Sequence, residues 1–162
     1  MNGAMMIPEF DHECAETRKA LERVPEDKFD WKPHEKSYSL HALAAHLAEV
    51  PQWVPVTLTM DVFDLDAPYD RVVPETKDAI LAHFDEGVAA ARELIEAATG
   101  DQLMETWSMK QGGEVALSMP KGAVLRSFIF NHMIHHRAQL GVYLRMLDVP
   151  VPAHYGPSAD EQ

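Results

Sequence analysis

The chain has 162 residues, of which 46% are hydrophobic and 25% are charged, and its formal net charge is −12. This length and composition indicate one globular domain, which we place at residues 1–162. The negative charge argues against a surface that follows nucleic-acid phosphates or anionic lipids, because such surfaces need clustered Lys and Arg. We therefore expect neither nucleic acid nor a membrane as a partner.

The single cysteine, Cys14, cannot form a disulfide within the chain, which is typical of a reducing compartment. Its neighbours Glu13 and Glu16 disfavour the thiolate, so we expect an inert thiol. Residues 1–10 show neither the basic segment nor the long apolar run of a signal peptide, and the other apolar runs are too short to span a membrane. We therefore expect a cytoplasmic protein.

Apolar residues at helical spacing predict a first helix over about residues 9–23, ended by Pro25. Ser39 is a suitable N-cap for a second helix. Pro51 predicts that this helix ends or kinks, with residues 52–60 resuming as a second piece.

A third helix is expected over about residues 75–98, with Gly100 as its C-terminal stop. Residues 101–118 contain two short alternating runs around the pair Gly112-Gly113, which favour a small hairpin or an irregular excursion.

A fourth helix is expected over about residues 121–147, followed by an irregular tail over residues 151–162. Four long helices with modest connections predict an all-α protein, most economically a four-helix bundle. The cores of such bundles commonly hold metal ions between facing helices.

The strongest chemical signal lies in the fourth helix, where His132 and His136 are four residues apart and project from one face. Leu125 and Ile129 share that face, so it should point inward. Buried imidazoles need partners, and one divalent metal ion would satisfy both rings. A pair of core histidines that bond only to other protein groups remains the alternative.

The second helix offers a third ligand, His46, which interrupts an otherwise apolar stripe. His41 lies five positions earlier and faces elsewhere, so we prefer His46. Three neutral imidazoles leave the ion an open position, which is typical of catalytic rather than structural sites. The donor set suits several metals, of which we expect Zn or Ni.

Two further residues are candidates for catalytic roles. Glu49 lies three residues from His46, where it would act as a fourth ligand or a general base, and a solvated surface role is the alternative. Tyr143 follows on the face of His136 and is a candidate pocket residue, with simple packing as the alternative. The core or the pocket wall is expected to hold the three tryptophans Trp31, Trp53 and Trp107.

One pattern covers the chain nearly end to end. It consists of residues 31–40, His46, residues 131–140 and residues 152–161. In these segments the chain resembles the DinB/YfiT-like superfamily. The resemblance implies a four-helix bundle, often a homodimer, with one metal-binding histidine on the second helix and two, spaced by four, on the fourth. Carried over, these are His46, His132 and His136.

The resemblance also implies an activity, because the characterised relatives are mostly thiol-S-transferases that use mycothiol, bacillithiol or glutathione. We therefore expect a metal-dependent transferase whose partners are a small-molecule thiol, held as a metal-bound thiolate, and an electrophilic substrate. A hydrolase that uses metal-bound water is one alternative. A non-catalytic, metal-binding stress-response protein is another.

Overall fold

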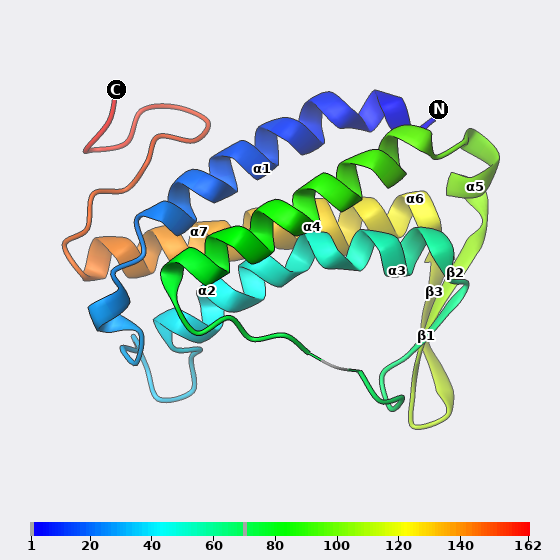
Figure 1. Ribbon diagram of the computed structural model, residues 1–162, viewed down its shortest axis with the longest axis horizontal. Helices are drawn as coiled ribbons and strands as arrows, with labels where there is room; N and C mark the ends of the chain where they lie inside the picture. Colours follow the sequence, from blue (N-terminus) through cyan, green and yellow to red (C-terminus); the bar gives the residue numbers. More distant parts are fainter. Residues whose placement is uncertain (1, 70) are drawn as a thin grey trace.

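The computed structural model describes residues 2–69 and 71–162. Four helical segments lie side by side, and a small sheet closes one end of the molecule (Figure 1). The α-helices among the described residues are α1 Ile7–Glu22, α2 Leu40–Glu49, α3 Trp53–Thr59, α4 Lys77–Ala97, α5 Gly100–Met104, α6 Lys121–Val124 and α7 Asn131–Met146. The strands are β1 Val62–Asp64, β2 Thr106–Gln111 and β3 Glu114–Pro120.

Local sequence explains where the second and third helical segments begin and break. Ser39 caps α2 by accepting a hydrogen bond from the Ala42 backbone amide at 3.1 Å, as predicted. Pro51 converts the chain to a 3-10 turn, η3 Val50–Gln52, before α3 resumes. Thr76 caps α4 in the same way as Ser39 caps α2.

The last helical segment differs from a regular α-helix. Between α6 and α7 lies a six-residue π-helical stretch, η4 Leu125–Phe130, which ends immediately before Asn131. A π-helical turn holds more residues per turn than an α-helix and is often found at functional sites. The expected continuous helix over residues 121–147 is therefore correct in extent and wrong in regularity.

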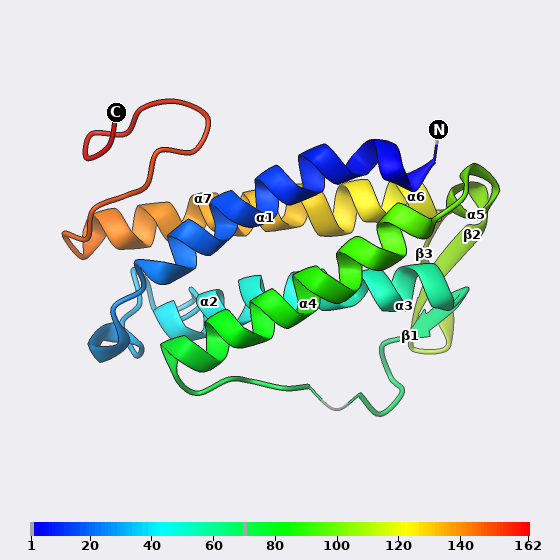
Figure 2. The same cartoon turned by 45° about the horizontal axis from the view of Figure 1, so that its top comes forward.

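The helical segments do not simply alternate in direction. α1 and α7 run one way and α2 and α4 run the other, so the chain must return along the molecule after α3 (Figures 1 and 2). Residues 60–69 and 71–76 lie along this return, and at its start β1 pairs in parallel with β2. α1 and α2 each pack against both α4 and α7.

The prediction of an all-α protein is wrong in one respect, because the structure contains a three-stranded sheet in the order β1-β2-β3. The hairpin of β2 and β3 occupies the region where a small hairpin was expected. Its turn places Gly112 at φ 62° and Gly113 at φ 79°, a left-handed conformation that other residues adopt at a cost. Gly100 does not end α4, since it is the first residue of α5, which Thr99 caps.

One continuous apolar core lies between the four helical segments. Its largest fully buried apolar side chains include Phe10, Phe84, Phe130, Leu43 and Leu47. Within the described ranges, no helix combines the length and the apolar character that crossing a bilayer would require.

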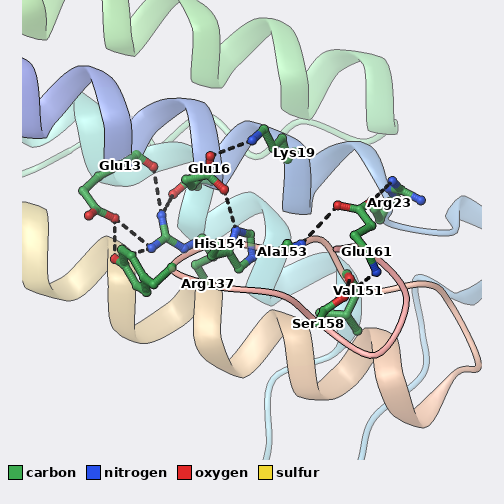
Figure 3. A network of polar contacts seen from close by, with 12 residues as sticks. Glu13, Glu16, Lys19, Arg23, Arg137, Val151, Ala153, His154, Ser158 and Glu161 are labelled. Carbon is green, nitrogen blue, oxygen red and sulfur yellow. Dashed lines mark hydrogen bonds and ion pairs between the residues drawn. The ribbon is translucent and has the colours of Figure 1, made fainter.

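A polar network attaches the C-terminal tail to α1 and α7 (Figure 3). Arg137 is 2% exposed and donates hydrogen bonds to the Glu13 carboxylate at 2.7 Å, the Glu13 carbonyl at 3.0 Å and the Tyr155 hydroxyl at 2.5 Å. His154 pairs with Glu16 at 2.9 Å. The tail is irregular, as expected, but it is held by specific bonds.

We predict that Arg137→Met lowers the free energy of unfolding by about 3–5 kcal/mol, because the buried Glu13 carboxylate loses its countercharge. Urea denaturation measures the change. Arg92→Met is the matched control, since Arg92 pairs with Asp11 and Glu96 at the surface and its loss should cost much less. Equal losses in the two variants would contradict a stabilising role for the buried pair.

Candidate metal centre

Three imidazoles converge between α2 and α7, as the helical faces predicted. The Nε2 atoms of His46 and His132 are 3.0 Å apart. The ring of His136 lies 4.6 Å from that of His46 and 4.5 Å from that of His132, measured between centroids. One nitrogen from each ring falls within 4.8 Å of the other two.

The donor set fits a divalent metal ion. Two metal–nitrogen bonds of about 2.0–2.1 Å span about 4 Å, so nitrogens this close need only small side-chain rotations to share one ion. Burial and the neighbouring imidazoles His136, His46 and His135 lower the pKa of His132 from 6.5 to about 4. Burial also lowers the pKa of His136. Both rings are therefore neutral at pH 7, as metal ligation requires.

Glu49 is not part of the triad and lies on the Nδ1 side of the His46 ring. Its carboxylate is 3.7 Å from His46 Nδ1, in the range of an ion pair but too long for a hydrogen bond, and it accepts from Arg71 at 2.9 and 3.1 Å. Burial raises the pKa of Glu49, but His46 and Arg71 outweigh it, and the net pKa is lowered. A charged carboxylate in this place favours the His46 tautomer that carries its proton on Nδ1, leaving Nε2 free as a ligand.

Gln139 plays a similar part for His136. The Nδ1–H of His136 donates to Gln139 Oε1 at 2.7 Å, so its Nε2 keeps a lone pair for a ligand. The aromatic ring of Trp53 completes the enclosure, with its centroid 5.6 Å from His46 and 5.2 Å from His132.

The other candidates are not members of the triad, although the His135 ring lies 4.9 Å from that of His136. Tyr143 donates a hydrogen bond to the Tyr38 carbonyl at 3.2 Å and packs edge-on against Trp31, so its contacts are structural, and its catalytic role stays a prediction. His41 faces away, as expected, with its Nε2 2.8 Å from the Pro74 carbonyl. His135 is exposed.

A cavity of about 360 Å³ extends from His46 towards the sheet. Trp53, Glu49 and Arg71 line it near the histidine, and Trp107 and Met109 of β2 contribute from the sheet. The place of Arg71 beside the site was not predicted. Arg71 lies in a loop 22 positions after Glu49, and no helical or strand periodicity relates the two residues. Trp107 lines the cavity, in agreement with its expected place in the core or the pocket wall, whereas Met109 was not singled out from the sequence.

These observations define a mostly helical protein with a three-histidine group suited to a divalent metal ion. The chain belongs to the DinB family, whose model matches residues 2–162. It is 22% identical over 155 residues to the uncharacterized protein YrdA of Bacillus subtilis (strain 168), covering 96% of this chain and 89% of that protein.

Two crystal structures share the fold. One is a DinB-like protein from Bacillus cereus ATCC 10987, with a TM-score of 0.72 and 20% identity, covering 93% of this chain and 95% of that one. The other is the DinB-like protein YjoA from Bacillus subtilis, with a TM-score of 0.71 and 18% identity, covering 95% and 99%.

We predict that Glu49→Gln weakens metal binding by about 10–100-fold, because His46 loses the carboxylate that orients its ring. Competition with a fluorescent zinc chelator measures the affinity. Glu93→Gln on the exposed face of α4 is the matched control and should bind as wild type does. An unchanged affinity in Glu49→Gln would show that the carboxylate has no such role.

The lowered pKa of His132 predicts a pH dependence of stability in the metal-free protein. Between about pH 6.5 and pH 4 the unfolded chain binds a proton that the folded chain does not, so stability falls as the pH is lowered through this window. His132→Phe removes this proton linkage. Between pH 7 and pH 5, the wild type should therefore lose on the order of 1–2 kcal/mol more unfolding free energy than the variant.

Urea denaturation in the presence of a chelator measures this difference. Carboxylates elsewhere titrate equally in both proteins and cancel in the comparison. Parallel pH profiles for wild type and His132→Phe would contradict a depressed pKa at His132.

Proposed function

We propose that this protein is a divalent-metal-dependent transferase that joins a small thiol to an uncharged electrophile. The observation that carries the proposal is the convergence of three imidazoles next to a largely apolar cavity. Membership of the DinB family supports it, since the characterised relatives that the sequence resembles are mostly thiol-S-transferases.

The ligand set supports catalysis rather than a structural role for the ion. Three protein nitrogens leave at least one position open, whereas structural zinc sites are usually closed by four protein ligands. His46, His132 and His136 would hold a divalent ion such as Zn or Ni, which would supply the charge that lowers the pKa of a bound thiol towards neutral pH.

The side chains around the triad have positioning roles in this proposal. Glu49 and Gln139 hold His46 and His136 in the tautomers that present Nε2 to the ion. Arg71 forms an ion pair with the Glu49 carboxylate, and the pKa of Glu49 is lowered. Glu49 would therefore be a weak general base and is better suited to orienting His46. Trp53 limits the access of water to the reacting atoms.

The thiol must come from outside the chain. Cys14 is the only cysteine, and it is 4% exposed. Burial and the charges of Asp11 and Glu13 raise the pKa of its thiol far above the usual value, so the thiolate is disfavoured, in agreement with the expected inert side chain.

The direct test is conjugation of glutathione, bacillithiol or mycothiol with chlorodinitrobenzene by untagged protein loaded with Zn or Ni. In this reaction the sulfur forms a bond to the ring carbon, chloride leaves with its electron pair, and the thiol proton passes to solvent. We predict that His132→Ala lowers kcat/KM by at least about 100-fold, because a triad without one imidazole no longer holds the ion in place.

His135→Ala is the matched control, since His135 is an exposed neighbour outside the triad and its loss should leave turnover nearly intact. Equal activity in wild type and His132→Ala would remove the proposal. Turnover of ester or lactone substrates without any thiol would favour the hydrolase instead. A chelator that unfolds the protein would favour a structural ion.

A further inference from the structure

The inner face of the small sheet forms one wall of the cavity beside His46. Alternate side chains of a strand point to the same face, and Trp107 and Met109, two positions apart on β2, both line the cavity. Ser108 lies between them and points the other way, where its hydroxyl is 3.1 Å from that of Ser118 on β3. The sheet therefore presents apolar side chains to the cavity and polar ones to solvent.

Met109 lies at the centre of this inner face. Its neighbour on β1 is Phe63, which is paired with it in register and also lines the cavity. Its neighbour on β3 is Leu117. The register of β2 and β3 shifts directly after Met109, and such irregularities often occur beside functional sites, where they redirect a side chain. Met109 and Phe63 are only partly buried, so a ligand in the cavity can contact both of them.

The other end of the cavity is bounded by the metal centre. His46 and Trp53 line that end, and the sheet lies beyond α3 at the end of the helical segments (Figure 1). Between the two ends the wall includes Val56 of α3 and Ile129 of η4. The volume of about 360 Å³ is at the small end of the range of roughly 300–1,000 Å³ that ligand pockets occupy. The separation of the sheet from the metal centre therefore limits the length of a ligand that fits.

Charge limits the ligand as well. Within the described part of the wall, the charged side chains Glu49 and Arg71 form an ion pair at 2.9 Å. A further charge in the cavity would be removed from water among apolar side chains, which is costly. The cavity therefore suits the uncharged body of an electrophile better than a polar thiol.

We propose that Met109 is a specificity-determining residue, which sets the length of the apolar alkyl or aromatic group that the electrophile carries. The reacting carbon lies beside the three histidines, and the apolar group extends from it until it meets Met109 and Phe63. The inference rests on the proposed function in one respect, since it assigns the cavity to the electrophile. Methionine suits this position, because its unbranched and flexible side chain adapts to ligands of slightly different shape.

The test measures the binding of three phenyl ketones of increasing length to the full-length, metal-free protein. Acetophenone, butyrophenone and hexanophenone are uncharged, carry the same ring and carbonyl, and differ only in the length of the alkyl chain. Each is titrated into wild type and Met109→Ala, which removes the side chain beyond Cβ. Met146→Ala is the matched control, because Met146 is exposed on α7 and lies outside the cavity wall.

We expect Met109→Ala to raise the affinity for hexanophenone relative to acetophenone by about tenfold, since the longer chain buries further methylene groups in the space that the side chain leaves. Met146→Ala should leave this ratio unchanged. The proposal would be overturned by an unchanged ratio in Met109→Ala, by an equal change in Met146→Ala, or by a wild type that binds none of the ketones.

A second measurement uses the wild type, with its methionine methyl groups labelled with carbon-13. In a carbon–proton correlation NMR spectrum, butyrophenone should move the Met109 signal and leave those of Met5, Met104 and Met146, which are exposed outside the cavity wall. Met109→Leu, which nearly conserves the side-chain volume, identifies the Met109 signal by its absence. If Met109→Ala does not fold, this spectrum alone decides, and a Met109 signal that stays in place overturns the proposal.

The two proposals fail separately, because the ketones carry no leaving group and the protein in this test carries no ion. A changed length preference in Met109→Ala, without thiol transfer by the wild type, would keep Met109 as the residue that sets ligand length and remove the transferase. Thiol conjugation by the wild type, with an unchanged length preference in Met109→Ala, would keep the transferase and remove the role of Met109.

Discussion

The site depends on the direct packing of α2 against α7. Leu43 and Leu47 on α2, and Met133 and Leu140 on α7, are fully or almost fully buried, and they fix how far and at what rotation the two helices approach. The histidines occupy adjoining positions on the same helices, so apolar packing brings their nitrogens together without any metal ion. This arrangement explains how three basic rings that would repel one another when protonated are held in close contact.

Electrostatics then determine which form the rings take. Partial burial and mutual proximity disfavour protonation of His132 and His136, while the Glu49 carboxylate beside His46 selects the tautomer of that ring. Arg71 keeps this carboxylate charged from a segment without regular secondary structure. A preorganised set of neutral donors is what a divalent cation needs, because little energy is then spent on reorganising ligands.

The sequence was sufficient for the parts of the site that follow helical periodicity. The four-residue spacing of His132 and His136 and the apolar stripe around His46 predicted the triad, because rotation per residue in a helix is nearly constant. Periodicity could not predict the three-residue strand β1, which is too short to show alternation, or the π-helical stretch before α7, which has no simple sequence signature. Arg71 and Met109 reach the cavity only through tertiary packing, so neither was singled out from the sequence.

The cavity wall is formed partly by helices and partly by the strand hairpin. Substitutions in these two parts have different consequences during evolution. The side that carries the three histidines is built on helices, where each substitution must also fit the shared core. The opposite side of the cavity is formed by Trp107 and Met109 of the strand hairpin. Residues of the connection between α3 and α4 also contribute to it. Mutations accumulate more readily in such peripheral segments. A descendant of this protein can therefore acquire a different ligand preference by rebuilding the hairpin side while inheriting the three-histidine group unaltered.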